Sequence, residues 1–349
     1  MPPQPYLQQI LEARTTLSRE QARNLMHQIL DGQLTDIEIA ALLGALAARG
    51  ETASEIAGFV DVMRTAVTSI PLTDAERLNL VDTCGTGGDA SGTFNISTAA
   101  ALVAAATGAT SGANLMVAKH GNRAVTSQTG SADVLEALGI PVDLSPDDAA
   151  TNLRTLRFAF LHAPSLHPAM KAVMPVRRAL GVRTVFNILG PLTNPAGASA
   201  QVMGVYSPHM VPIVAEAMAL LGTRHAFVVH GNTFREKGLD EISISGPSQL
   251  AEVRGGVVTI TTITPEDFGF QRSDLEALRG GNAQTNAAIL AAIFSGERGP
   301  RRDIVLLNAA AVLVVADLAF DLPTGIALAA KTIDSGAVTK LIANLSTKS

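Results

Sequence analysis

The 349-residue chain has one cysteine, Cys84, no tryptophan and only 4% aromatic residues. A single cysteine excludes an internal disulfide framework and any cysteine-ligated metal cluster. So few aromatic rings argue against a surface on which nucleic-acid bases stack. The 26 Lys and Arg against 31 Asp and Glu give a net charge of −5, whereas binding a phosphate backbone needs a basic surface. We therefore expect a small-molecule partner and no nucleic acid.

The chain also lacks long uninterrupted hydrophobic runs. Residues 1–18 contain no basic segment followed by an apolar one, so we expect no secretory signal. The most apolar stretch, 304–320, is interrupted by Asn308 and Asp317 and falls well short of the ~20 residues of a membrane span. We expect a buried helix there, no membrane association and a cytoplasmic location. With 47% hydrophobic and 16% charged residues, the chain has enough apolar material for a sizeable core.

Three helix starts are visible in the first seventy residues. Each has a Ser or Thr followed three residues later by Glu or Gln, a capping box in which each side chain bonds the other residue's backbone amide. The pairs are Ser18 with Gln21, Thr35 with Glu38 and Thr52 with Glu55. An apolar stripe at helical spacing follows the first start: Ala22, Leu25, Met26, Ile29 and Leu30. This face must be buried, either against the rest of the chain or against a second copy.

From about residue 78 short apolar runs alternate with helices rich in small residues. We expect strands over 78–81, 115–118, 158–161, 202–206 and 226–229, and helices over 98–106, 131–138, 211–221 and 283–294. This alternation predicts an α/β fold with a mainly parallel sheet. The expected organisation is a small helical domain over 1–72, with 168–185 packed onto it, and a larger α/β domain over 73–167 and 186–349.

The strongest local motif occupies residues 82–98, which run from a strand end through a glycine-rich loop into a helix. Its glycines are Gly85, Gly87, Gly88 and Gly92, and its polar residues at the helix entry are Thr93, Asn95, Ser97 and Thr98. Glycines allow a ligand to approach the backbone closely, and a helix N-terminus attracts anions. The motif favours a phosphate site over a glycine-rich turn without a ligand.

Two further motifs suit a diphosphate ligand. Lys119 and Arg123 follow a predicted strand, where open α/β sheets bind ligands, although alone they would be typical of a solvated loop. Asp240 and Glu241 are adjacent; hard oxygen ligands next to phosphates indicate Mg²⁺, but an isolated acidic pair is usually just surface.

A fourth motif places arginines among apolar residues between 167 and 195. Arg177, Arg178 and Arg183 belong to it, and an arginine fork there would recognise a carboxylate. For His162 and His167 a structural role is at least as well supported as a catalytic one.

Together these motifs resemble the anthranilate phosphoribosyltransferase family. The segments that carry the resemblance are 85–89, 95–98, 119–123, 183–195 and 238–241, in family order over almost the whole chain. The resemblance implies transfer of the phosphoribosyl group from 5-phosphoribosyl 1-diphosphate to anthranilate, in tryptophan biosynthesis. It also implies a fold shared with pyrimidine nucleoside phosphorylases and a homodimer formed through the helical domain.

The resemblance further implies a set of site residues. Those matching the diphosphoribosyl site are Gly85, Gly88, Asp89, Thr93, Asn95, Ile96, Ser97, Thr98, Lys119, His120, Gly121, Asn122, Arg123, Ala124, Val125, Thr126, Ser127 and Ser131. Those matching anthranilate contacts are Gly85, Asn122 and Arg177, with His120 and His167 as lesser candidates. Those matching Mg²⁺ ligands are Ser97, Asp240 and Glu241. No side chain is expected to act as a nucleophile.

Two segments, 110–115 and 231–238, are longer than the resemblance implies. Three other functions stay open from the sequence alone: a nucleoside phosphorylase, a nucleic-acid-binding relative on the same scaffold, and a homologue that has lost activity.

Overall fold

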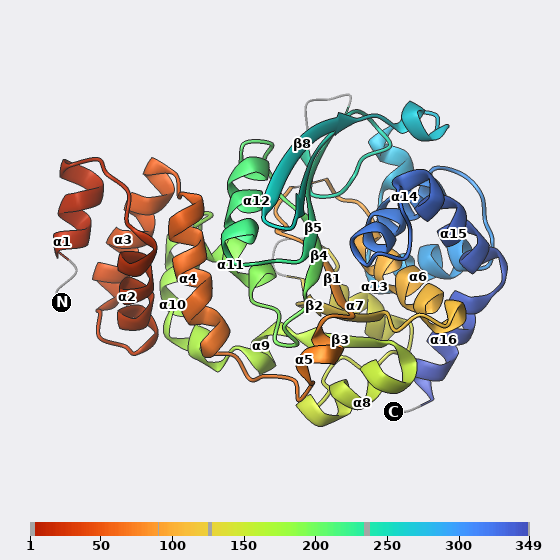
Figure 1. Cartoon of the computed structure of the whole chain (residues 1–349), viewed down its shortest axis with the longest axis horizontal. Helices are drawn as coiled ribbons and strands as arrows, with labels where there is room; N and C mark the ends of the chain where they lie inside the picture. Colours follow the sequence, from red (N-terminus) through yellow and green to blue (C-terminus); the bar gives the residue numbers. More distant parts are fainter. Residues whose placement is uncertain (1–3, 90, 125–127, 234–237, 348–349) are drawn as a thin grey trace.

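The computed structural model describes residues 4–89, 91–124, 128–233 and 238–347 (Figure 1). Its N-terminal part is helical, with α1 (Gln4–Leu7), the π-helix η1 (Gln8–Glu12), α2 (Arg19–Leu30), α3 (Asp36–Arg49) and α4 (Ala53–Thr65). The three predicted capping boxes are all present, at Ser18, Thr35 and Thr52. The predicted helix starts are therefore confirmed.

A segment from the middle of the chain lies against these helices. It contains η2 (Pro168–Ala172), α10 (Met174–Leu180) and α11 (Phe186–Leu192). α10 contacts α3, η2 contacts α2 and α11 contacts α4 (Figure 1). Val173 and Val176 share a hydrophobic core with Leu25 and Phe59 of the N-terminal helices.

The sheet follows the order β3-β2-β1-β4-β5-β7-β8, with β6 paired to β5. Its strands are β1 (Leu80–Gly85), β2 (Met116–Gly121), β3 (Phe158–His162), β4 (Ala200–Gly204), β5 (His225–Asn232), β6 (Gly238–Leu239), β7 (Ser248–Arg254) and β8 (Val257–Ile263). β1 to β5 are parallel, which confirms the predicted fold class. The antiparallel strands β7 and β8 were not expected; they form a hairpin closed by Gly255 and Gly256, both with positive φ.

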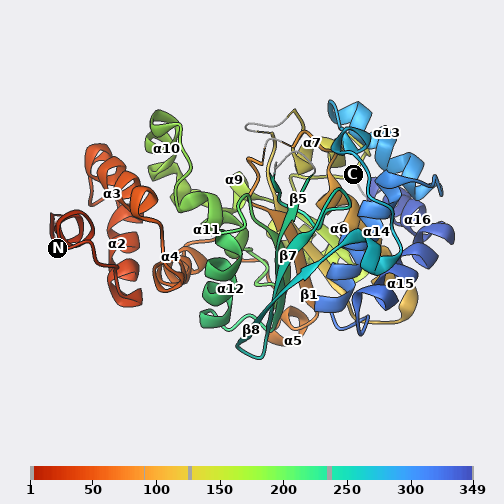
Figure 2. The ribbon, with the colours of Figure 1, turned by 90° about the horizontal axis from the view of Figure 1, so that it is seen from above.

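Helices cover both faces of the sheet (Figure 2). One face carries α6 (Ile96–Ser111), α13 (Ala283–Phe294), α14 (Pro300–Val315), α15 (Leu322–Asp334) and α16 (Ala337–Ser346), and the other carries α12 (Met210–Leu220) next to the N-terminal helices. The remaining short elements are α5 (Asp74–Arg77), α7 (Ser131–Ala137), α8 (Pro146–Leu156), α9 (Ala163–Leu166), η3 (Pro265–Phe268) and η4 (Leu275–Leu278).

The apolar stretch at 304–320 supplies most of α14, whose residues from Ile304 to Val315 are all buried. The prediction of a buried helix is confirmed. Within the described part of the chain, no helix combines the length and the hydrophobicity needed to cross a bilayer.

The strand order reverses between β1 and β4, at the middle of the sheet. The chain runs from β1 to β2 on one side, whereas β4 pairs with β1 on the other. Loops leave the carboxyl ends of such neighbouring strands in opposite directions, and ligands of open α/β sheets bind in the gap between them. The glycine-rich motif follows β1 directly, so it lies at this gap.

Candidate active site

The glycine turn after β1 is shaped by backbone requirements at several positions. Gly87, Gly88 and Gly92 have φ of 69°, 75° and 69°, values that favour glycine. Gly85 has an ordinary φ, but a Cβ there would overlap the carboxylate of Asp240. Gly204, its partner in the register of β1 with β4, is crowded by the Asp240 backbone in the same way. The segment after β6 therefore packs directly on two glycines.

The acidic pair Asp240 and Glu241 joins the two ends of the glycine-rich motif. The Gly87 amide donates to Asp240 Oδ2 at 2.7 Å, and the Ser97 amide donates to Glu241 Oε1 at 2.9 Å. Asn95 precedes α6 without a side-chain cap, so Glu241 occupies the position that a local capping residue would otherwise take. Asp89 approaches the same place, accepting from the Asp240 amide at 3.4 Å.

Burial raises the pKa of both acidic side chains, and the charge of Asp240 raises that of Glu241 further. Asp89 also raises the pKa of Asp240, and Lys119 opposes the rise at Glu241. Carboxylates gathered in this way are stabilised by a cation. No group of three His, Cys, Asp or Glu within the described ranges has the spacing of a self-sufficient metal site. Two carboxylates with the Ser97 hydroxyl fit Mg²⁺, which takes few protein ligands beside waters and phosphate oxygens.

Lys119 lies at the end of β2 and is only 2% exposed. Its Nζ donates to the Thr83 carbonyl at 2.7 Å and to Ser97 Oγ at 3.3 Å. Burial lowers the pKa of Lys119, whereas the nearby charges of Asp82 and Glu241 raise it. The ammonium group thus stands between β1 and the start of α6, facing the acidic pair.

The other predicted residues of the first loop lie around the entrance to α6. Thr93 forms a bridge with Arg279, and its Oγ1 lies 3.3 Å from Ser91 Oγ. Asn95 Nδ2 donates to the Thr129 carbonyl at 3.3 Å, which ties the first loop to the loop after β2. Ile96 and Thr98 are buried in the first turn of α6.

The loop after β2 is organised mainly by its own contacts. Asp133 accepts from the amides of Ala124 and Gly130 at 2.9 and 2.8 Å, and Ser131 Oγ donates to the Asn122 carbonyl at 3.3 Å. Gly121 ends β2, and a Cβ there would overlap the Ser131 hydroxyl. Of the predicted positions, Val125, Thr126 and Ser127 lie outside the described residues.

Arg123 is not directed at Lys119 or at the acidic pair. Its guanidinium is bound to Glu136 and lies 3.6 Å from carboxylate oxygens of both Asp133 and Asp143. The structure therefore brings together Lys119, Ser97, Asp240 and Glu241, and holds Arg123 apart from them in a separate ionic network.

Arg177 lies on α10, half-buried, with its guanidinium carbon 5.5 Å from the centre of the Phe186 ring. Burial lowers the pKa of Arg177, and no described carboxylate lies within ion-pair distance of it. A half-buried guanidinium without a counter-charge suits an anionic ligand.

A buried histidine pair lies between β2 and the middle segment. His120 Nε2 and His167 Nε2 are 3.0 Å apart, and the His120 amide donates to Asp82 Oδ1 at 3.1 Å. Burial lowers the pKa of His120 to about 3 and that of His167 to about 4. Both rings are therefore neutral at pH 7.

The pair should make stability depend on pH. In the unfolded chain both rings take up protons below about pH 6.5, while in the folded chain they stay neutral, so stability falls as the pH falls. Between pH 7.5 and 5.5 we expect a loss of about 1.4 kcal/mol for each ring. Urea unfolding at the two pH values should show a smaller fall in the free energy of unfolding for the double variant His120→Gln/His167→Gln than for the wild type. For His27→Gln, which changes an exposed ring, the fall should equal that of the wild type. An equal loss in all three proteins would contradict this assignment.

Two residues that make contacts at the site, Asn194 and Tyr206, were not among those predicted from the sequence. Asn194 Nδ2 donates to Asp82 Oδ2 and to the Ala118 carbonyl, both at 2.8 Å, and so joins β1 to β2. Tyr206, after β4, stacks under Arg183. Asn194 lies within a segment that carried the family resemblance, which is the one sequence signal that could have singled it out.

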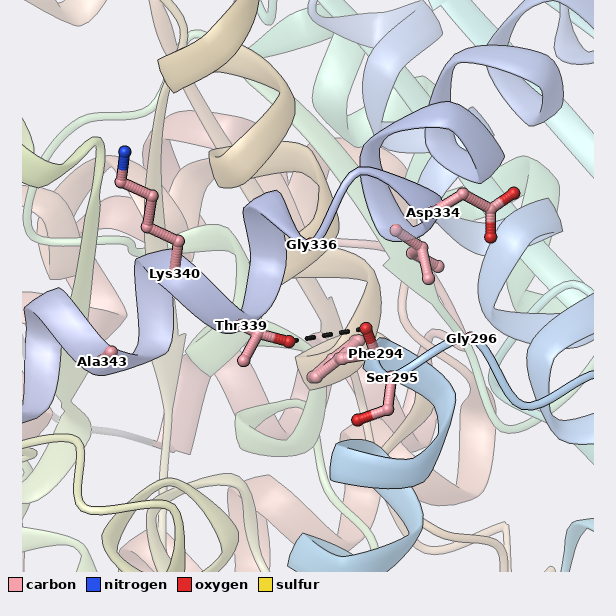
Figure 3. Close-up of a pocket in the computed structure, with 9 residues that line it drawn as sticks. Phe294, Ser295, Gly296, Asp334, Gly336, Thr339, Lys340 and Ala343 are labelled. Atoms are coloured by element: carbon pink, nitrogen blue, oxygen red, sulfur yellow. Dashed lines mark hydrogen bonds between the residues drawn. The ribbon is translucent and has the colours of Figure 1, made fainter.

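A hollow of about 640 Å³ lies elsewhere, between the end of α13 and the start of α16 (Figure 3). Thr339 Oγ1 donates to the Phe294 carbonyl at 3.4 Å across it, and Asp334 and Lys340 stand at its margins. It is lined by none of the predicted site residues.

Two protein-family models match the chain. The "Glycosyl transferase family, helical bundle domain" matches residues 4–67, and the "Glycosyl transferase family, a/b domain" matches residues 77–339. An anthranilate phosphoribosyltransferase from Brevibacillus brevis is 51% identical over 332 residues, 95% of this chain and 93% of the relative. One from Chloroflexus aggregans is 51% identical over 326 residues, 93% of this chain and 92% of the relative.

Solved structures of anthranilate phosphoribosyltransferases are similar to this chain over nearly its full length. Anthranilate phosphoribosyltransferase from Thermus thermophilus superposes with a TM-score of 0.87 at 41% identity, covering 98% of both chains. The Saccharomyces cerevisiae enzyme in complex with PRPP and Mg superposes with a TM-score of 0.86 at 27% identity, covering 99% of this chain and 98% of that one.

Proposed function

We propose a function from the premise that this chain belongs to the anthranilate phosphoribosyltransferase family. The resemblance found in the sequence is thereby confirmed. The chain transfers the phosphoribosyl group from 5-phosphoribosyl 1-diphosphate to anthranilate, giving N-(5-phosphoribosyl)anthranilate and diphosphate in tryptophan biosynthesis.

One structural observation gives this proposal its main support. Three segments far apart in the sequence, the turn after β1, Lys119 and the acidic pair, meet at one crevice through the contacts of Gly87, Ser97 and Thr83. Backbone amides, a buried cation and buried carboxylates are the groups that a magnesium diphosphate requires. The donor is therefore assigned to this crevice.

The residues that would hold Mg²⁺ are Asp240, Glu241 and Ser97. When bound, the ion supplies positive charge to the leaving diphosphate. The chain itself supplies the Lys119 ammonium and the amides of the glycine turn, which stabilise the negative charge that develops as the bond at ribose C1 breaks. The predicted contacts of Gly85, Gly88, Asp89, Thr93 and Asn95 with the donor belong to this same proposal.

The acceptor is bound next to the donor by the middle segment. Arg177 holds the anthranilate carboxylate, and Asn122 helps to aim the amine at C1. An aryl amine is neutral and nucleophilic at pH 7, so the reaction needs neither a strong general base nor a nucleophilic side chain. Positioning of the two substrates is worth up to about 7–11 kcal/mol in well-oriented systems.

Removing the Arg177 guanidinium should separate the two substrates kinetically. Arg177→Ala loses a charge-assisted contact with the carboxylate, so we expect the KM for anthranilate to rise by about 10- to 100-fold, with little change in the KM for the donor. Initial rates with each substrate varied in turn measure this. Arg178→Ala removes an exposed charge from the same helix and serves as the control. An equal rise in both KM values would show that Arg177 does not hold the acceptor.

The proposal extends to the assembly and the organisation of the chain. Residues 1–72 with 168–185 form the helical domain, and a homodimer forms through it; Leu11 and Ile37 expose 57% and 82% of their surface there. Large exposed apolar side chains of this kind are typical of interaction surfaces when they are clustered. A cytoplasmic location accords with a biosynthetic role.

The direct test is the loss of anthranilate fluorescence on mixing the protein with 5-phosphoribosyl 1-diphosphate and Mg²⁺. Loss of fluorescence that needs both the donor and the ion supports the function. Phosphorolysis of uridine or thymidine without turnover of anthranilate would replace it by a nucleoside phosphorylase.

A further inference from the structure

Arg183 connects the middle segment to the glycine turn. Its Nη2 donates a hydrogen bond to the Gly88 carbonyl, and its guanidinium carbon lies 4.4 Å from the centre of the Tyr206 ring. Arg183 lies between α10, which carries Arg177, and α11. The residue thus reaches from the segment assigned to the acceptor to the loop assigned to the donor.

Tyr206 holds the same turn at a second point. Its amide donates to Thr86 Oγ1 at 3.1 Å, while the Thr86 amide donates to the Gly204 carbonyl at 2.9 Å. Because the ring of Tyr206 also supports the guanidinium, one residue fixes both Arg183 and the start of the turn. A guanidinium stacked on a ring keeps its edges available for hydrogen bonds.

The turn is therefore held at two consecutive residues. The Gly87 amide is bound by Asp240, and the Gly88 carbonyl is bound by Arg183. Since a peptide unit is planar and trans, fixing the Gly88 carbonyl also fixes the direction of the Asp89 amide. Gly88 has φ of 75°, and a Cβ there would lie 3.3 Å from Arg183 Nε, so the arginine sits directly against the glycine.

We propose that Arg183 is a positioning residue for the donor: supported by Tyr206, it orients the 88–89 peptide so that the turn is already arranged for the diphosphate. This inference rests on the proposed function. It makes Arg183 act on the donor, whereas Arg177, six residues earlier on the same segment, acts on the acceptor. Arg183 is exposed to solvent, and a direct contact with a substrate is the competing role that the experiment must separate.

The experiment compares Arg183→Ala, Arg183→Lys and the control Arg178→Ala. For Arg183→Ala we expect the KM for the donor to rise at least about tenfold, with a much smaller change for anthranilate. Arg183→Lys should recover only part of the loss, because an ammonium group lacks the planar edge that stacks and donates. Tyr206→Leu should resemble Arg183→Ala in direction, and Tyr206→Phe, which keeps the ring, should resemble the wild type.

Hydrogen exchange of the ligand-free protein separates positioning from direct contact. In Arg183→Ala the amides of 83–89 should exchange several-fold faster than in the wild type, while the melting temperature and the exchange of α14 stay unchanged. Unchanged exchange at 83–89, or a rise confined to the KM for anthranilate, would overturn the proposal. Exchange does not depend on turnover, so an inactive wild type would reject the proposed function and leave this readout intact.

Discussion

Asp240→Asn combined with Glu241→Gln should lower the Mg²⁺-dependent turnover by about 1,000-fold or more. Removing a single group that stabilises transition-state charge costs about 10²–10³-fold, and this variant removes both carboxylates assigned to the ion. The measurement is the initial rate of anthranilate consumption over a Mg²⁺ titration. An unchanged titration curve would reject the metal assignment.

The same variant should be more stable than the wild type when Mg²⁺ is absent. Both carboxyl groups have a pKa raised above that of the unfolded chain, mainly by burial; the charge of Asp89 adds to the rise at Asp240, and the charge of Asp240 adds to the rise at Glu241. Such groups favour the folded state at low pH, and this contribution is lost as the pH rises through their folded values. Neutral amides avoid that loss, so the melting temperature at pH 8 in EDTA should rise.

A matched control for both measurements is the exposed acidic pair on α8. Asp147→Asn with Asp148→Asn removes two adjacent charges from exposed side chains in the first turn of that helix. In this control we expect no fall in the Mg²⁺-dependent turnover and no rise in the melting temperature in EDTA. A rise in stability for the control as large as that for the site variant would show that net charge, and not repulsion at the site, is responsible.

The elements were predictable where their signals are local. The capping boxes at Ser18, Thr35 and Thr52 depend on residues three positions apart, and all three form as expected. The predicted strands also fall on β1 to β5, with ends displaced by a few residues. The β7–β8 hairpin did have a local signal, since Gly255–Gly256 directly precedes 257–263, a run made entirely of β-branched residues.

The site was less predictable because its contacts join distant positions. Glu241 caps the start of α6 at Ser97, across 144 residues, and no local pattern reports such a contact. The sequence predicts Arg123 as a second cation for phosphate beside Lys119, and in the structure Glu136, Asp133 and Asp143 lie around its guanidinium. Whether a charged side chain meets a ligand or its own neighbours depends on tertiary packing, which spacing along the chain does not encode.

Gly85→Ala should lower kcat/KM by about 100-fold and the free energy of unfolding by about 1–3 kcal/mol. Its backbone could accept a side chain, but the new methyl group would overlap the Asp240 carboxylate and displace it from the Gly87 amide. Activity assays and urea unfolding measure the two effects. Gly44→Ala in α3, where a Cβ meets no atom within 4 Å, is the control and should stabilise by about 0.5–1 kcal/mol.

A second background tests whether Gly85→Ala acts through Asp240. Asp240→Ala removes the carboxylate into which the methyl would project, and the next nearest atom, the Asp240 carbonyl oxygen, lies 3.3 Å away. Adding Gly85→Ala to Asp240→Ala should therefore cost little further stability, a non-additivity expected only of residues in contact. Activity should remain low in the double variant, because Asp240 is missing. Full additivity of the two stability losses would mean that Gly85 is required for the path of β1 itself, and not for the placement of the acidic pair.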